Sequence, residues 1–118
     1  MFNYHLKPAV AREWNRHLND DLARTVAKHP RRLVGLGTLP MQDPQLAVEE
    51  LRRCVNELGL KGVQVASHIN AWQPDGKVKN VMLSDESLRP IFEAAAELGC
   101  GVFVHPWYDN GMVWHGMV

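Results

Sequence analysis

The feature that most constrains the fold of this chain is a sequence unit that occurs twice. In each copy an amphipathic helix pattern ends at a Leu-Gly pair, and a short apolar run follows it. The first unit starts at Asp43 and leads into residues 62–67, and the second starts near Ser84 and leads into residues 101–107. Short apolar runs between helices are typical of parallel strands, because both faces of a parallel sheet are usually covered. The repeat therefore predicts right-handed βαβ units of the kind that build a (β/α) barrel.

A further amphipathic helix is predicted between Pro8 and Pro30, where apolar residues recur at every fourth position. The expected buried stripe consists of Val10, Trp14, Leu18, Leu22 and Val26. The apolar run over residues 33–39 then predicts a strand buried on both faces. Gly35 and Gly37 alternate in this run, so one face of the strand is open to close approach by another element. The expected fold is α/β, with about three parallel strands in the order helix-strand-helix-strand-helix-strand, the alternation found in a (β/α) TIM barrel.

Capping and turn residues place the ends of the other predicted helices. Asp43 is the expected N-cap of the second helix, and Gly59 and Gly99 are expected to end the second and third helices in the left-handed conformation. The charged residues of the second helix are interpreted as its solvent-exposed face; they are Glu49, Glu50, Arg52 and Arg53. The stretch over residues 72–77 is interpreted as a polar loop, because Pro74-Asp75-Gly76 is a turn signal.

Composition argues against several classes of partner. The 13 Lys and Arg residues balance the 13 Asp and Glu residues, so neither nucleic acid nor an anionic membrane surface is an expected partner. No apolar run approaches the ~20 residues that span a bilayer, and the first residues lack the pattern of a secretory signal. Cys54 and Cys100 are expected to be reduced thiols of a cytoplasmic protein, with a disulfide or a catalytic thiol as the alternatives.

Polar side chains follow each predicted strand, at the end where parallel α/β sheets place their active sites. These side chains belong to Thr38, Gln42, Ser67, His68, Asn70, His105 and Trp107. His105 is the strongest candidate, because neutral imidazole is the commonest metal ligand; a histidine bonded only to backbone is the alternative. The remaining histidines are interpreted as surface or packing residues; they are His5, His17, His29 and His115. The sequence contains no complete zinc motif, P-loop or Gly-x-Ser-x-Gly motif, so no catalytic residue is assigned.

Several segments closely resemble the aminocarboxymuconate-semialdehyde decarboxylases, which belong to the amidohydrolase superfamily of metal-dependent barrels. The segments are residues 18–23 (LNDDLA), 31–42 (RRLVGLGTLPMQ), 46–50 (LAVEE), 62–65 (GVQV) and 103–107 (FVHPW). The resemblance extends in the same order from about Met1 to Trp107. It implies a (β/α)8 barrel and the non-oxidative removal of a carboxylate as CO2 with a divalent metal, usually zinc.

The resemblance also implies roles for individual residues. His105 corresponds to the metal ligand of the family's fifth strand, and the rest of the expected site binds a small carboxylate substrate. The expected substrate-binding residues are Tyr4, His68, Asn70 and Trp107. The family's His-x-His would precede Met1, and its later histidines and its aspartate ligand would follow Val118. Residues 1–118 are therefore interpreted as a single partial domain that lacks the first and last strands and has little activity alone, since a whole barrel needs ~250 residues.

Other interpretations remain open at this point. The chain could belong to an amidohydrolase-type hydrolase of unknown substrate, to a non-catalytic α/β module that binds a ligand or a partner, or to a product that does not fold stably. An open three-stranded parallel sheet has two unpaired edges and exposes apolar surface. Self-association into a homo-oligomer is therefore a further expectation.

Overall fold

Three parallel strands form the sheet against which the helices lie. In the computed structural model, which describes residues 2–107, the strand order is β1 (Leu36–Gly37), β2 (Gly62–Ala66) and β5 (Gly101–His105). β2 and β5 pair in parallel register along their whole length, and their last residues lie opposite each other. The predicted parallel arrangement is thus confirmed, and the carboxyl ends of the strands lie at one edge of the sheet.

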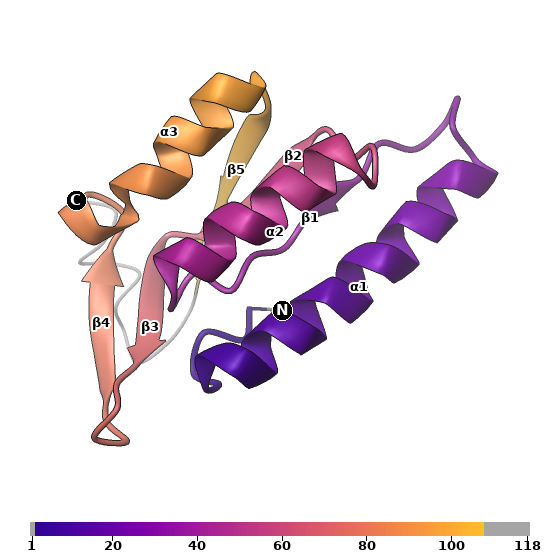
Figure 1. The fold of residues 1–118 in the computed structure, drawn as a ribbon. Coiled ribbons are helices and arrows are strands. Elements are labelled where there is room, and N and C mark those ends of the chain that lie inside the picture. Colours follow the sequence, from indigo (N-terminus) through magenta and orange to yellow (C-terminus); the bar gives the residue numbers. More distant parts are fainter. Residues whose placement is uncertain (1, 108–118) are drawn as a thin grey trace.

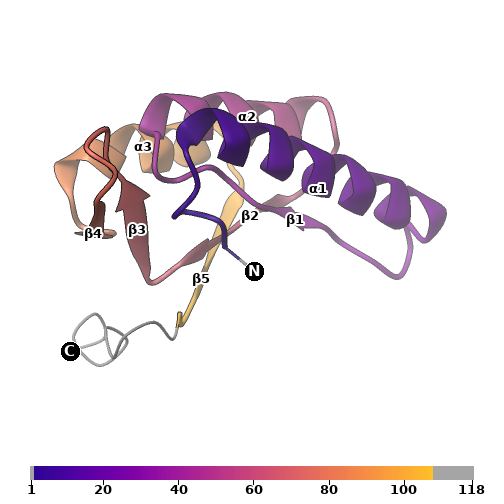
Figure 2. The same ribbon diagram turned by 90° about the horizontal axis from the view of Figure 1, so that it is seen from below.

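Three α-helices cover one face of this sheet, as Figures 1 and 2 show. They are α1 (Pro8–Lys28), α2 (Pro44–Asn56) and α3 (Arg89–Leu98), and a 3-10 turn, η1 (Glu86–Leu88), precedes α3. In Figure 2 the helices form one layer above the strands, and no helix of the described residues lies on the opposite face. Within the part of the chain that the structure describes, none of the helices combines the length and apolar character needed to cross a membrane.

The predicted helix caps are confirmed. The Asp43 carboxylate accepts a hydrogen bond from the backbone N–H of Leu46 at 3.1 Å, and Pro44 is the first residue of α2. Gly99 has a φ of 62° directly after α3, and Gly59 has a φ of 67° shortly after α2. Both values lie in the left-handed region, where a residue with a Cβ is strained.

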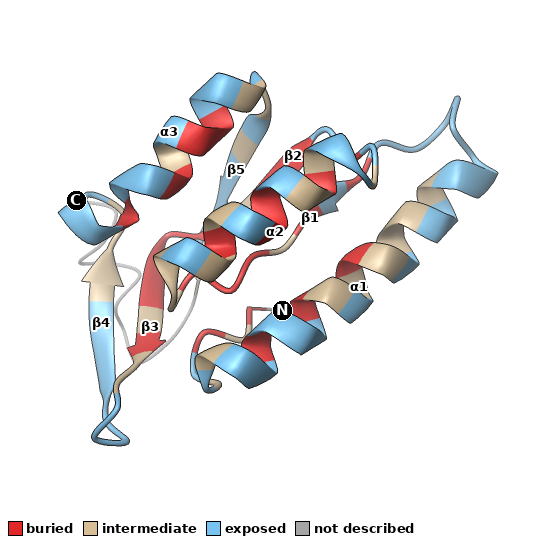
Figure 3. Ribbon diagram, viewed as in Figure 1, coloured by how far each residue is buried: buried red, intermediate tan, exposed pale blue. Residues whose placement is uncertain are grey.

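The hydrophobic core lies between α2, α3 and the sheet, and Figure 3 shows buried residues on the helix sides that face the strands. Its large buried side chains include Leu51, Val63, Val65, Ile69, Leu88 and Ile91. Complete burial of one such side chain stabilises a fold by ~1.5–3 kcal/mol. The core therefore anchors the strands whose ends carry the candidate site.

Other elements approach the first strand closely at its two glycines, as predicted. A Cβ on Gly37 would lie 2.8 Å from Cys54 Sγ of α2 and 3.1 Å from Asn19 Oδ1 of α1. A Cβ on Gly35 would lie 2.6 Å from Leu60 Cδ2. This face of the strand therefore has no room for side chains.

The prediction that the strand at residues 33–39 is buried on both faces is wrong, and the last strand is also exposed. β1 comprises only two of the predicted residues 33–39, and Val34 is 71% exposed. In β5, Phe103 is 52% and Val104 is 46% exposed. The reason is that β1 and β5 are the two edge strands among the described residues, and no helix of that region covers their second face.

The buried face of α1 also differs from the predicted stripe, because Val10 is 54% and Trp14 is 49% exposed. The buried positions are Ala11, Asn15 and Asn19. Asn19 Nδ2 donates to the carbonyl oxygen of Thr38 at 2.9 Å, and the N–H of Thr38 donates to Asn19 Oδ1 at 2.8 Å. Because buried backbone groups need hydrogen-bond partners, α1 turns this amide toward the sheet in place of a large apolar side chain.

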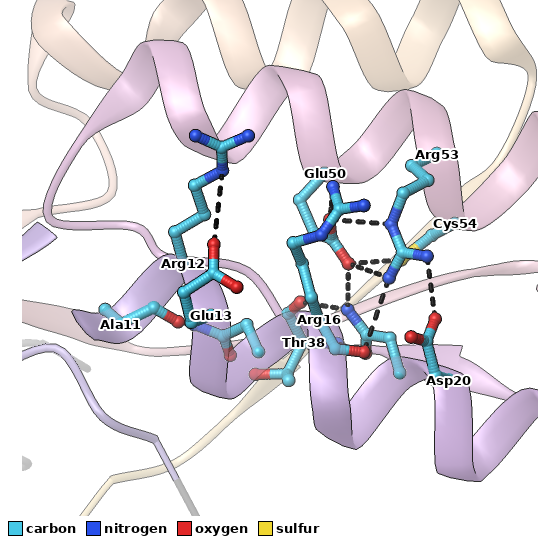
Figure 4. Close-up of polar contacts among 11 residues, drawn as sticks. Ala11, Arg12, Glu13, Arg16, Asp20, Thr38, Glu50, Arg53 and Cys54 are labelled. Atoms are coloured by element: carbon cyan, nitrogen blue, oxygen red, sulfur yellow. Dashed lines mark hydrogen bonds and ion pairs between the residues drawn. The ribbon is translucent and has the colours of Figure 1, made fainter. Parts of the chain in front are cut away.

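The interpretation of Glu50 and Arg53 as solvent-exposed residues is wrong, because both belong to an ion cluster between α1 and α2 (Figure 4). The Glu50 side chain is 3% exposed, and its Oε1 lies 2.8 Å from Arg53 Nη2. Arg53 Nη1 lies 2.7 Å from Asp20 Oδ1, and Asn19 Nδ2 donates to Glu50 Oε1 at 2.8 Å. The carboxylates of Glu50 and Asp20 raise the pKa of Arg53. The cluster joins α1 to α2.

The predicted polar loop over residues 72–77 is the connection of an antiparallel hairpin that the sequence did not predict, with Trp72 as the last residue of the first hairpin strand. β3 (His68–Trp72) pairs with β4 (Val78–Met82). The predicted turn lies between them, with Gly76 at a φ of 81° and the Asp75 carboxylate accepting from the N–H of Lys77. β4 mixes charged and amide residues with apolar ones, and most of it is exposed, so it lacks the continuous apolar run that identified the other strands.

Both cysteine thiols are free, as predicted, and the disulfide alternative is removed; the cytoplasmic location stays a prediction. Burial raises the pKa of Cys54 to about 12, and the Glu50 carboxylate adds to this shift. Such a thiol is almost entirely protonated near neutral pH, so it is a poor nucleophile. Burial also raises the pKa of Cys100, although this thiol is only half-buried.

Candidate active site

Ser67 connects the carboxyl ends of the two longest parallel strands. Ala66, the last residue of β2, lies opposite His105, the last residue of β5. The backbone N–H of Ser67 donates to the carbonyl oxygen of His105 at 3.0 Å. The Ser67 hydroxyl accepts a hydrogen bond from the N–H of Trp107 at 3.2 Å. These bonds fix the position of residues 105–107 at the edge of the sheet.

His105 is exposed at this edge, and its ring has a defined hydrogen bond. Its Nδ1 lies 2.6 Å from the carbonyl oxygen of Pro106. Because a carbonyl oxygen only accepts, this contact assigns the proton to Nδ1 in the neutral ring and leaves the Nε2 lone pair free of that proton. A histidine that ligates a metal commonly donates its other N–H to a backbone carbonyl in this way.

The imidazole of His105 therefore fits one position in the ligand set of a divalent metal. Residues 2–107 contain no group of three or more His, Cys, Asp or Glu side chains that could hold a metal ion. Zinc sites in proteins use three or four protein ligands. The described residues thus supply one suitable ligand and not a complete metal site.

Phe2 is the aromatic residue that links His105 to the rest of the site. The centroid of its ring lies 6.3 Å from that of His105, 5.1 Å from that of Trp107 and 5.3 Å from that of Tyr4. The rings of Phe2 and Trp107 meet edge to face, at an interplanar angle of 72°. This geometry is favourable for aromatic pairs, so the rings form an apolar wall beside His105.

A small pocket of about 140 Å³ opens beside this wall. It is lined by Phe2, Tyr4, His5, Asn70 and Trp107. Whole small-molecule sites usually measure ~300–1,000 Å³, so the pocket holds only part of a ligand. It brings together three of the predicted substrate-binding residues, which are Tyr4, Asn70 and Trp107.

Three hydrogen bonds of the Tyr4 and Gln42 side chains hold the N-terminal segment over the strand ends. The hydroxyl oxygen of Tyr4 accepts from the N–H of Ala66 at 3.1 Å, and burial raises the pKa of Tyr4. Gln42 Nε2 donates to the carbonyl oxygens of Asn3 and Leu6, each at 3.0 Å. Tyr4 is therefore a neutral phenol at physiological pH, and Gln42 supports the segment that carries it.

The fourth predicted substrate-binding residue, His68, does not line the pocket. Its side chain is fully buried at the start of β3. Its Nδ1 lies 3.4 Å from the Ser67 hydroxyl oxygen, and its Nε2 has no hydrogen-bond partner among the described residues. The role of His68 in substrate binding stays a prediction.

The pocket includes residues to which the sequence alone assigned no site role. Phe2 and His5 line it, although His5 was interpreted as a surface or packing residue. The family resemblance, which extends from about Met1 and so includes Phe2, was the signal that could have identified this residue. Thr38 was a candidate because it follows a strand, but its backbone groups bond Asn19 of α1. His115 lies outside the described residues.

Comparisons with known proteins agree with this geometry. A family model described as Amidohydrolase matches residues 5–116. The 2-amino-3-carboxymuconate-6-semialdehyde decarboxylase of Dictyostelium discoideum is 47% identical over 107 residues, which cover 91% of this chain and 27% of that protein. The chain therefore spans about a quarter of the length of this curated relative.

Solved structures show the same fold. A 2,6-dihydroxybenzoate decarboxylase complexed with 2,6-dihydroxybenzoate superposes with a TM-score of 0.79 at 32% identity, covering 94% of this chain and 34% of that chain. A dihydroxybenzoic acid decarboxylase from Polaromonas sp. JS666, with bound manganese and the inhibitor 2-nitroresorcinol, gives a TM-score of 0.79 at 33% identity. It covers 94% of this chain and 33% of that chain.

Proposed function

This chain belongs to the amidohydrolase family, and we propose that it contributes one metal ligand and part of the substrate pocket to a metal-dependent, non-oxidative decarboxylase. The observation that carries the proposal is the position of His105. Its ring lies at the carboxyl end of β5, its Nδ1 is engaged by the Pro106 carbonyl, and an aromatic pocket begins at the adjacent Phe2 ring.

In this proposal Nε2 of His105 holds the divalent metal, together with ligands outside the described residues. The metal would supply Lewis acidity and lower the pKa of a bound water. We favour zinc, because a neutral imidazole is among its preferred ligands; the manganese in the structure of a relative supports a divalent ion in general. The hydrogen bonds of Ser67 keep the histidine in place during turnover.

The pocket is proposed to receive a small conjugated or aromatic carboxylate. The rings of Phe2 and Trp107 offer apolar surface to a planar molecule, and the amide of Asn70 offers a polar contact at the pocket wall. Apolar walls that exclude water strengthen the electrostatic interactions of a bound charged group. The names of the relatives support this substrate class, because they act on carboxylated unsaturated or aromatic molecules.

Two further proposals concern the assembly of the protein and its location in the cell. The exposed apolar residues Phe103 and Val104 of the edge strand β5 support burial of this edge in a larger assembly, either by further barrel strands or by a second copy in a homo-oligomer. The two free thiols support a reducing, cytoplasmic location. Size-exclusion chromatography with light scattering and cell fractionation test these proposals.

A chimera tests the enzymatic proposal directly. In it, the matching segment of the Dictyostelium discoideum decarboxylase is replaced by that of this chain, and CO2 release from 2-amino-3-carboxymuconate-6-semialdehyde and 2,6-dihydroxybenzoate is measured with zinc or manganese. We expect activity toward at least one substrate and a loss of about 100-fold or more in His105→Ala, in line with the loss of a metal ligand. His29→Ala, which removes an exposed histidine beyond α1, is the control. Full activity of the His105→Ala chimera would refute the proposal.

A further inference from the structure

The face of β3 that carries Asn70, which lines the pocket, extends along the strand toward Trp72. Alternate residues of a strand point to the same face, so His68, Asn70 and Trp72 share one face of β3. Asn70 lines the pocket, and Trp72 follows one pleat repeat, or ~7 Å, farther along the strand. The indole of Trp72 is therefore the next side chain on this face after the pocket.

A cation lies over that indole. Lys7 Nζ is 6.0 Å from the centroid of the Trp72 ring, at the ~6 Å reach of a cation–π interaction. Lys7 is exposed, and no ion pair joins it to a carboxylate among the described residues. Its positive charge is thus positioned by an aromatic ring and is not neutralised by an acidic side chain of that region.

The backbone around Lys7 adds to the positive potential. Lys7 is the N-cap of the 21-residue helix α1, whose first turn has neither an acidic residue nor a side-chain cap. The positive end of the helix dipole therefore lies at the residue that carries the ammonium group, and the first turn of α1 has no compensating acidic side chain. His5 lines the pocket and lies two residues before Lys7 in the sequence. The cation is therefore close in sequence to a residue of the pocket wall.

We infer that Lys7, supported by the ring of Trp72, binds a carboxylate group of the molecule whose apolar part occupies the aromatic pocket. The inference rests on the proposed function, because it names the anionic group by which a substrate of this site is held. A lysine ammonium acts as a point charge with three rotatable N–H donors, which suits a carboxylate on a small ligand. Lys7 is not part of the proposed metal site, and its ammonium group binds a carboxylate through its own charge and N–H donors, without a metal.

Binding of benzoate to the 118-residue chain without metal tests the inference, with benzamide as the neutral isostere. The readout is the displacement of the indole N–H signals of Trp72 and Trp107 in 1H–15N NMR spectra. We expect benzoate to shift both signals, and its dissociation constant to rise about three- to tenfold in Lys7→Gln, the effect of losing one partly exposed charge-assisted contact. Lys7→Arg should bind benzoate nearly as well as the wild type. Lys28→Gln, which removes a lysine from the last turn of α1, should change nothing.

Three results with benzoate would overturn the inference. They are equal benzoate affinities for the wild type and Lys7→Gln, benzoate shifts that leave the Trp72 signal unmoved, and no benzoate binding by the wild type. An equal loss of benzamide binding in Lys7→Gln would also overturn it, because Lys7 would then act on the shape of the pocket. Since this assay contains neither metal nor turnover, its failure leaves the decarboxylase proposal standing, and failure of the chimera leaves the role of Lys7 standing.

Discussion

The hydroxyl oxygen of Ser67 accepts a hydrogen bond from the backbone N–H of Trp107 at 3.2 Å, which joins the residue after β2 to the segment after β5. Ser67 is 9% exposed, so water has little access to this bond. The contact lies beside the aromatic pocket, and its loss would release the segment that presents both Trp107 and His105.

Replacement of Ser67 by Ala is therefore expected to loosen this segment. The variant leaves the half-buried backbone N–H of Trp107 without the Ser67 hydroxyl that accepts its hydrogen bond, which lowers the unfolding free energy by about 1–2 kcal/mol. Acrylamide should also quench Trp107 fluorescence more strongly than in the wild type, measured in a background where the other tryptophans are Phe. Ser84→Ala, at an exposed serine, is the matched control. Equal quenching and stability in Ser67→Ala and the wild type would show that the bond does not hold the segment.

The ion cluster between α1 and α2 makes a second prediction. Glu50→Gln removes the carboxylate that contacts Arg53 Nη2 at 2.8 Å and leaves a largely buried guanidinium with only part of its neutralising charge. The expected loss is about 2–3 kcal/mol of unfolding free energy, measured by urea denaturation. Glu49→Gln changes the neighbouring exposed residue, whose contact with Gln45 lies at the surface, and should shift the free energy by less than about 0.5 kcal/mol. Similar losses in both variants would contradict the account.

The glycines of the sheet make a third prediction. Gly37→Ala places a Cβ 2.8 Å from Cys54 Sγ and 3.1 Å from Asn19 Oδ1, so α1 or α2 must move. We expect a destabilisation of about 1–3 kcal/mol in thermal or urea unfolding. Gly101→Ala is the control within the same sheet, because the nearest atom to its added Cβ, the carbonyl oxygen of Lys61, is 3.9 Å away. A Gly37→Ala variant as stable as Gly101→Ala would contradict the close packing.

The thiol of Cys54 makes a prediction about pH. Burial raises its pKa from the ordinary 9.0 to about 12 in the folded chain, so ionisation favours the unfolded state above pH 9.0. The contribution of the neutral thiol to stability is fully present below about pH 9 and is lost as the pH rises toward 12. A Cys54→Ala variant should therefore lose less stability than the wild type between these values, as followed by urea denaturation at each pH. Parallel pH profiles would contradict this assignment.

The same burial predicts a difference between the two thiols in labelling. At pH 8 we expect Ellman's reagent to modify the half-buried Cys100 first, and Cys54 only as fast as the chain opens. Unfolding in urea should expose both thiols at once, and the reaction of the unfolded chain gives the total number of reactive thiols as a control. Equal rates for both thiols in the folded chain would show that Cys54 is accessible.

Local signals in the sequence predicted the helices and the parallel strands well. Asp43, Gly59 and Gly99 mark helix ends because their side-chain or backbone preferences act within a few residues. The close approach at Gly35 and Gly37 was also predictable, because a strand face without side chains lets another element pack directly against the backbone. The histidine at the end of β5 followed from the strand pattern alone.

Long-range contacts explain what the sequence alone did not predict. α1 turns Asn19 inward because its amide bonds Thr38 and Glu50, a pairing that no helical periodicity indicates. Glu50 and Arg53 looked like exposed charges because their partners are 30 or more positions away on α1. β4 was missed since an exposed hairpin strand needs no apolar run. The role of Phe2 in the pocket likewise depends on tertiary contacts with His105 and Trp107.

The central claim is that His105 offers its Nε2 to a divalent metal while its Nδ1 remains bonded to the Pro106 carbonyl. The most direct measurement is an anomalous-scattering crystal structure of the chimera loaded with zinc. We expect the zinc peak at ~2.0–2.1 Å from His105 Nε2, with the contact between Nδ1 and the carbonyl oxygen of Pro106 preserved. A zinc ion bound without His105, or through its Nδ1, would contradict the account.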